Sequence, residues 1–262
     1  MARRWPRHDP HAPEPVSRRA RRLDPGAATG LALTVALVLL IVGGVVLGVL
    51  AFVIRSDPDA IGLDASAAKW GAAHATAFTD SVLQRITNIG QPRSIIVLAA
   101  VLGIVETIRT RSRWIIPFLL VVVAGNGFIT TTIKHLADRV RPSFNPAAEA
   151  LGPSFPSGHS SWSAAFFAAA ALILARHASR RARVVLAGVA AGLAVAIAAT
   201  RVLLDVHWLS DVVAGLALGW AWFAVCSIAF GGRLLRFGAT AEALEAESER
   251  PPREERPRAA VR

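Results

Sequence analysis

Six long apolar runs dominate the pattern of hydrophobic and polar positions along the chain. They cover roughly residues 29–54, 91–108, 114–136, 159–176, 184–204 and 208–230. A helix rises about 1.5 Å per residue, so about 20 apolar residues cross the ~30 Å hydrocarbon core of a bilayer. The first run has 26 residues, which is longer than the ~7–15 residues of a signal-peptide core and predicts a retained span. The pattern therefore predicts an all-α, polytopic membrane protein with six transmembrane helices.

Polar segments flank this membrane domain. Residues 1–28 are rich in Arg, Pro and His, and residues 237–262 are rich in Ala, Glu, Pro and Arg. Neither segment shows hydrophobic periodicity, which is typical of disordered chain. We expect a disordered cytoplasmic arm over 1–28, a membrane domain over 29–236 and a disordered cytoplasmic tail over 237–262.

The longest connection between runs, residues 55–90, has a stripe of its own. Trp70, His74, Phe78, Val82 and Ile86 recur every four residues. This spacing predicts an amphipathic helix lying in the membrane interface. We interpret the segment as a structural cover; a lip over which a lipid passes is the alternative.

Composition and charge support the membrane class and indicate an orientation. The chain is 53% hydrophobic and 18% charged, with a formal net charge of +11. The 29 basic residues gather in the tails and in short loops between the runs, as topology signals do, so we expect no nucleic-acid partner. With the amino terminus inside, 21 of the 29 lie on the cytoplasmic side. We therefore expect a plasma (inner) membrane protein with both termini in the cytoplasm.

Three cations at the extracytoplasmic ends of runs call for an explanation. Lys134 and Arg141 are seven residues apart, close to two helical turns, although Pro142 indicates that the helix ends nearby. Arg201 ends the fifth run. Ionisable groups at such depth are costly and usually line a functional cavity, whereas any one of them alone could extend to the headgroups.

The fourth run opens with Phe155-Pro156-Ser157-Gly158-His159-Ser160. Ser157 is a plausible N-cap, and Gly158 lets a ligand approach the backbone closely. The free N–H groups and dipole of a helix start favour anions, and His159 can exchange protons near neutral pH.

The connection between the fifth and sixth runs contains His207 and Asp211, four residues apart. One helical turn would bring the carboxylate beside the imidazole and fix its tautomer, leaving the other ring nitrogen as a nucleophile. The predicted topology puts this pair, the three cations and the helix start on one membrane face. Together they meet the needs of phosphoryl transfer: charge neutralisation, a nucleophile and a proton donor.

These residues resemble the three signature motifs of the type 2 phosphatidic acid phosphatase family. The matching motifs are Lys134-x6-Arg141-Pro142, Pro156-Ser157-Gly158-His159 and Arg201-x5-His207-x3-Asp211; Thr200 stands where the family usually has serine. The resemblance implies that His207 attacks phosphorus with Asp211 orienting it, and that His159 protonates the leaving group. It also implies that the phosphoryl oxygens are held by Lys134, Arg141, Arg201, Ser157 and Gly158, with no metal and no cofactor.

The expected function is therefore hydrolysis of a lipid phosphate at the extracytoplasmic face through a phosphohistidine. We expect undecaprenyl pyrophosphate as the substrate, with phosphatidic acid and phosphatidylglycerol phosphate as alternatives. A non-catalytic lipid transporter of the same fold would need the anion site but not both histidines and Asp211. Transfer of phosphate to an acceptor other than water is not separated from hydrolysis by the sequence, and the oligomeric state stays open.

Overall fold

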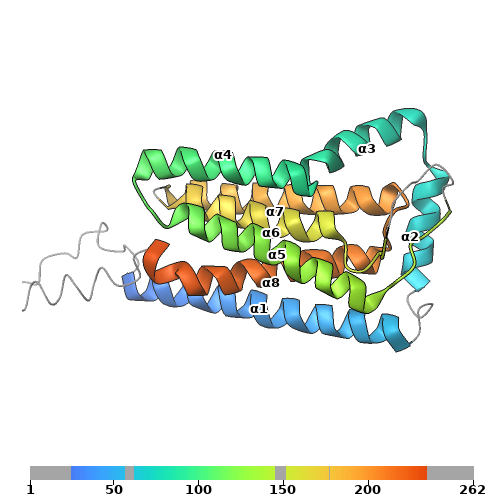
Figure 1. Ribbon diagram of the computed structural model, residues 1–262, viewed down its shortest axis with the longest axis horizontal. Helices are drawn as coiled ribbons and strands as arrows, with labels where there is room; N and C mark the ends of the chain where they lie inside the picture. The colour runs from blue at the N-terminus through green and yellow to red at the C-terminus, as the bar shows by residue number, and fades with distance from the viewer. Residues whose placement is uncertain (1–24, 57–61, 145–151, 177, 235–262) are drawn as a thin grey trace, which may run out of the picture.

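The computed structural model describes residues 25–56, 62–144, 152–176 and 178–234, and this part of the chain forms eight helices and no strand (Figure 1). In chain order the helices are α1 (Pro25–Ser56), α2 (Gly62–Ala73), α3 (Ala77–Ile89), α4 (Pro92–Thr110), α5 (Ile115–Ala137), α6 (Gly158–Ala175), α7 (Arg180–Leu203) and α8 (Leu209–Leu234). Most of the arm and tail expected at 1–28 and 237–262 lies outside the described residues.

The helices match the predicted membrane spans. α1, α5, α6, α7 and α8 are each long and apolar enough to cross a bilayer, and α3 with α4 forms a sixth candidate, bent by 45°. The all-α class is thus confirmed for the described residues, which hold five candidate spans, or six if the bent pair counts as one span. The predicted ends differ from the observed ones by at most four residues.

The six long helices lie side by side, and α8 contacts α1, α5, α6 and α7 (Figure 1). The start of α1 and the end of α8 lie at one end of the bundle, with the α4–α5 connection. α2 lies at the opposite end, where α6 and α8 begin. We call this second end the site end, because all the residues singled out above for chemistry lie in the connections and helix ends found there.

Side chains divide between the outside and the inside of the bundle as membrane proteins require. Large apolar side chains face outward, for example Ile104 and Phe128, which are 54% and 74% exposed in the absence of lipid. Polar side chains turn inward: Thr130 donates to Ser161, which donates to Asn126, linking α5 to α6. Without water in the hydrocarbon core, polar groups must pair between helices in this way.

Two glycines bring the starts of α6 and α8 together. A Cβ on Gly215 would lie 2.5 Å from the carbonyl oxygen of Ser157, and one on Gly219 would clash with that of Ser161. Only glycine permits this approach of two helix backbones. As a result, the Ser157 N–H donates to the carbonyl oxygen of Asp211 at 2.9 Å, and two of the three motifs are joined.

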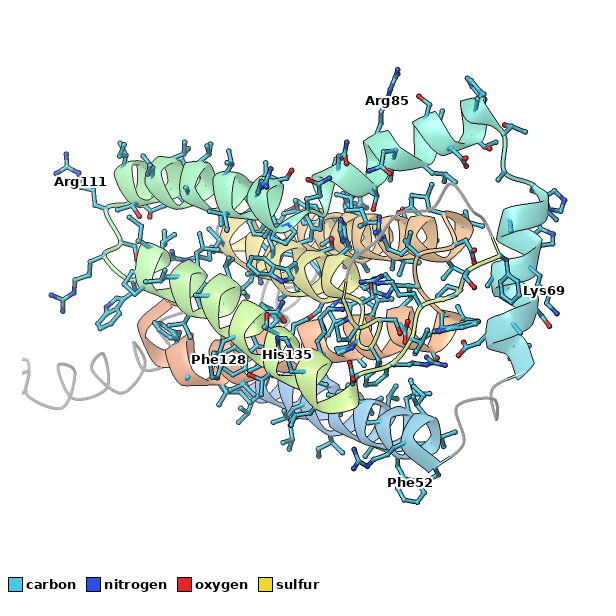
Figure 2. The ribbon with its side chains drawn as sticks, turned by 45° about the vertical axis from the view of Figure 1, so that its right-hand side comes forward. Phe52, Lys69, Arg85, Arg111, Phe128 and His135 are labelled. Atoms are coloured by element: carbon cyan, nitrogen blue, oxygen red, sulfur yellow. The ribbon has the colours of Figure 1, made fainter. Side chains whose placement is uncertain are left out.

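The prediction of one amphipathic helix in residues 55–90 is wrong. The chain forms two helices, α2 and α3, because Thr76 restarts the helix with a capping box in which Thr76 and Thr79 cap each other's backbone N–H groups. The stripe is divided at this point, and His74 stacks on Trp70 at the end of the first part with ring centroids 4.4 Å apart. The charged Lys69 and Arg85 point away from the bundle (Figure 2).

Candidate functional site

His207 and Asp211 form the pair that the sequence predicts. His207 lies between α7 and α8, and its Nδ1 is 3.3 Å from Oδ2 of Asp211 in the first turn of α8. A carboxylate can only accept a hydrogen bond, so Nδ1 carries the proton. The other ring nitrogen, Nε2, lies 3.2 Å from Nη1 of Arg141 and accepts from it. The lone pair of Nε2 is therefore directed at the Arg141 guanidinium.

The Asp211 carboxylate is fully buried and has a partner on each oxygen. Oδ2 also accepts from the backbone N–H of Trp208 at 3.0 Å, and Oδ1 accepts from Nη1 of Arg139 at 2.7 Å. The carboxylate closes the amino-terminal end of α8, where the helix dipole favours negative charge. These contacts keep Asp211 as an oriented anion.

The environment of His207 favours the neutral imidazole. Burial lowers the pKa of His207 from 6.5 to about 4, although the hydrogen bond and the charge of Asp211 act in the opposite direction. A buried imidazolium would lose its hydration and face Arg141 and Lys134. At neutral pH the ring therefore has the protonation state of a nucleophile.

Lys134 and Arg141 approach each other through the loop and not along one helix. α5 ends at Ala137, so Arg141 lies beyond it. Lys134 Nζ donates to the carbonyl oxygen of Pro153 at 2.6 Å, and Nη2 of Arg141 donates to the same oxygen at 3.3 Å. Arg141 Nε also donates to the carbonyl of Gly152 at 2.9 Å. Partial burial lowers the pKa of Arg141 and Asp211 raises it, but a guanidinium stays charged in proteins.

The start of α6 supplies the second motif. Ser157 holds the N-cap position, but its side chain makes no capping hydrogen bond and instead accepts from the Ser160 hydroxyl at 3.0 Å. Gly158 follows, and a Cβ placed there would lie 4.0 Å from Cε of Lys134. The lysine side chain thus runs alongside the first turn of α6, whose N–H groups have no partner within the helix.

His159 and Arg201 each have a buried nitrogen without a partner among the described residues, namely Nε2 of His159 and Nε of Arg201. Unpaired buried donors and acceptors are rare and call for an explanation. Both side chains interact electrostatically with Arg141, and His159 also does so with His207 and Lys134. The structure thus brings together all the residues that the sequence predicts for the site, and a bound phosphoryl group would give these two nitrogens partners.

Sequence reasoning missed three buried polar residues next to the site. Arg139 contacts Asp211, Asp64 of α2 contacts Arg139, and the Thr87 hydroxyl of α3 accepts from Nη1 of Arg201 at 3.0 Å. The only sequence signal was that Arg139 is one of the few basic residues on the side with little positive charge. Nothing in the 55–90 pattern marked Asp64 or Thr87 as buried.

The described residues contain no group of three His, Cys, Asp or Glu side chains that is placed to hold a metal ion. The positive charge around the two histidines comes from Lys134, Arg141 and Arg201, and Arg139 adds a further cation beside Asp211.

The fold and the site define a helical membrane protein in which an oriented histidine faces a group of cations at one end of the bundle. The family model described as the PAP2 superfamily matches residues 116–234, which include every residue predicted for the site. The chain belongs to this superfamily, which confirms the resemblance seen in the sequence.

The relatives differ in how much of the chain they match. The phosphatidylglycerophosphatase B of Bacillus subtilis is 31% identical over 145 residues, which are 53% of this chain and 70% of that protein. The lipid A 1-phosphatase of Rhizobium etli is 38% identical over 122 residues, or 43% of this chain and 48% of that protein. The chain thus spans about half the length of that relative.

A crystal structure of a transmembrane PAP2-type phosphatidylglycerolphosphate phosphatase from Bacillus subtilis has the same fold, with a TM-score of 0.70. The likeness covers 76% of this chain and 99% of that one at 24% sequence identity.

Proposed function

We propose that this protein is an integral membrane phosphatase that hydrolyses a lipid phosphate through a phosphohistidine at His207. The observation that carries the proposal is the state of the His207 ring: Asp211 holds Nδ1, while Nε2 accepts from Arg141 at 3.2 Å. A site that only bound phosphate would need the cations, but it would not need a neutral imidazole with a fixed tautomer. The names of the relatives, which are phosphatases of lipid phosphates, agree with this interpretation.

In the first step, Nε2 of His207 attacks phosphorus, the N–P bond forms and the bond from phosphorus to the lipid oxygen breaks. His159 gives a proton to that oxygen as it leaves. The charge on the transferring group is balanced by Lys134, Arg141 and Arg201, and the N–H groups of the α6 start add to this balance. Asp211 stabilises the positive charge that develops on the His207 ring.

In the second step, water attacks the phosphohistidine. His159, now without its proton, accepts a proton from the water, the O–P bond forms and the N–P bond breaks. Inorganic phosphate leaves and His207 returns to the neutral ring with Nδ1 protonated. The partly buried site limits the number of waters that reach the intermediate, but it must admit one.

The substrate belongs to the lipid phosphates, and the sequence and the relatives favour different members. The Bacillus subtilis relative, of which this chain covers 70%, is a phosphatidylglycerophosphatase. Undecaprenyl pyrophosphate, which we expect from the sequence, would use the same contacts for its terminal phosphate. Release of phosphate by purified protein from phosphatidylglycerol phosphate, undecaprenyl pyrophosphate, phosphatidic acid and lipid A, compared side by side, tests the proposal. No release from any of the four would contradict it.

We also propose that the site end faces away from the cytoplasm. The two short connections at the other end, 109–113 and 176–183, concentrate seven basic residues, and Arg111 lies there, far from Lys69 (Figure 2). Short loops rich in arginine stay on the cytoplasmic side during insertion. In this orientation both termini are cytoplasmic, and the substrate is a lipid of the outer leaflet of the plasma (inner) membrane.

A further inference from the structure

Asp64 is an acidic side chain that turns from α2 into the bundle. It is 3% exposed, whereas Lys69 on the same helix is exposed and lies over the Phe144 ring (Figure 2). A buried carboxylate is costly unless it is paired. Asp64 accepts from the backbone N–H of Ser210 at 2.8 Å, from the Ser210 hydroxyl, and from Nη2 of Arg139 at 2.9 Å. The side chain thus joins α2 to the first turn of α8.

Arg139 continues this chain of contacts to the proposed catalytic pair. Its Nη1 donates to Oδ1 of Asp211 and to the Ser210 hydroxyl, both at 2.7 Å. The guanidinium is buried and lies over the Trp208 ring, 5.4 Å from its centre. A planar guanidinium with two carboxylates on its two terminal nitrogens has little freedom to rotate. Asp211 is consequently held at one oxygen by Arg139 and at the other by His207 and a backbone N–H.

Stability alone does not account for this arrangement. Buried ion pairs lose their hydration, and well-packed apolar residues usually stabilise a core as well or better. Here the Asp64–Arg139 ion pair contacts the Asp211 carboxylate, which faces the His207 ring. A small rotation of that carboxylate would misdirect Nε2 of His207. Placing reacting groups within a fraction of an ångström has a large effect on rate.

We propose that Asp64 and Arg139 are positioning residues that hold Asp211, and through it the His207 ring, in the orientation needed for attack on phosphorus. The inference rests on the proposed function, because it concerns the reactivity of His207. It also gives the connection between α1 and α4 a role in the site, through one buried carboxylate of α2.

Asp64 and Arg139 carry opposite charges, so a positioning role can be distinguished from a general loss of folding. Removing the negative charge of Asp64 leaves Arg139 acting on Asp211 alone, so the pKa of His207 should fall. Removing the positive charge of Arg139 should raise the pKa of His207. The other charged or titratable groups that act on His207, or on His159 beside it, stay the same in both variants: Lys134 of α5, Arg141 of the loop, His159 of α6, Arg201 of α7 and Asp211 of α8.

The test compares Asp64→Asn and Arg139→Gln with two matched controls. Asp64 and Arg139 line a cleft with a volume of about 530 Å³. Asp138→Asn and Arg55→Gln make the same changes of charge on exposed side chains that line this cleft. Neither control side chain forms an ion pair with Asp211 or His207 in the described part of the chain. The measurement is the rate of phosphoenzyme formation from a phosphate-labelled lipid, as a function of pH, together with kcat and KM.

We expect Asp64→Asn and Arg139→Gln to lower the rate of phosphoenzyme formation about tenfold to a hundredfold, as loss of an orienting partner does elsewhere. KM should change by less than about threefold, because neither residue is placed to touch the phosphate. The pH midpoint assigned to His207 should move down in Asp64→Asn and up in Arg139→Gln. Both controls should behave like the unmodified protein.

Arg139→Gln leaves two buried carboxylates and can unfold the protein, so two further variants complete the test. Arg139→Lys keeps the positive charge but loses the planar guanidinium with its two terminal nitrogens. It should slow phosphoenzyme formation without moving the pH midpoint assigned to His207. The double variant Asp64→Asn with Arg139→Gln restores the charge balance, and its midpoint should return toward that of the unmodified protein. Shifts in the same direction in both single variants, or full rates in Asp64→Asn and Arg139→Lys, would overturn the inference. Absence of labelled phosphoenzyme in the unmodified protein would instead overturn the proposed function, and the inference with it.

Discussion

Replacing Arg141 by lysine tests whether the shape of this cation matters beyond its charge. The guanidinium donates to the carbonyl oxygens of Gly152, Pro153 and Val206 while Nη1 also faces Nε2 of His207. A lysine ammonium is a point charge on a flexible stem and cannot make these contacts and hold two phosphoryl oxygens at once. A hydrogen bond to a charged group contributes about 1.5–3 kcal/mol, and each 1.36 kcal/mol corresponds to a factor of about ten in rate.

We therefore expect Arg141→Lys to lower kcat/KM by about tenfold to a hundred-and-fifty-fold if one transition-state contact is lost. Phosphate release from the preferred lipid measures the effect, and the thermal unfolding midpoint in detergent shows whether the variant is folded. Arg85→Lys is the matched control, because Arg85 points away from the bundle (Figure 2). Unchanged kinetics with a lowered midpoint would refute the reasoning and leave Arg141 only the role of anchoring the loop.

The charges of the site and of the loops lead to three other expected outcomes. Phosphate release should continue in excess EDTA and be inhibited by vanadate, which can adopt the geometry of phosphoryl transfer; loss of activity in EDTA with recovery in magnesium would contradict this. Reporter fusions at Arg111 and Arg180 should report cytoplasm and fusions near Asn145 the outside, whereas the inverse pattern would place the site inside. Because the pKa of His207 in the folded protein, about 4, lies below 6.5, the unfolded state binds more protons between these values. The free energy of unfolding should therefore fall as pH decreases from 6.5 to about 4, and fall less in His207→Gln; equal slopes would contradict the assigned pKa.

The membrane spans could be predicted from the sequence because the bilayer imposes a strong rule on the chain. Each span must be a helix of about 20 apolar residues, so α1 and α5 to α8 are visible as runs. The i, i+4 spacing of His207 and Asp211 was equally visible, because a local contact near a helix start depends on few other residues. The convergence of the three motifs followed from topology, since alternate connections of a bundle lie at the same end.

The contacts that support the site could not be predicted in this way. Asp64 meets Ser210 across 146 positions of sequence, and Arg201 meets Thr87 across 114. Such pairs depend on where α2 and α3 lie against α7 and α8, which is decided by packing and not by periodicity. The break between α2 and α3 arises from the Thr76–Thr79 capping box. Its sequence signal is weak, because Thr79 stands where glutamate or glutamine is usual, and the apolar stripe continues on both sides of it.

The two histidines provide the measurement that tests the central claim most directly. The purified protein is mixed with a phosphate-labelled lipid, quenched, and assayed for label on histidine in the unmodified protein, in His207→Ala and in His159→Ala. His207→Ala should acquire no label and release no phosphate from either the lipid or p-nitrophenyl phosphate. His159→Ala keeps the nucleophile, so it should regain activity on p-nitrophenyl phosphate, whose leaving group needs no protonation. Label on His207 of the unmodified protein is the predicted result; label retained in His207→Ala, or rescue of His207→Ala but not of His159→Ala by p-nitrophenyl phosphate, would contradict the account.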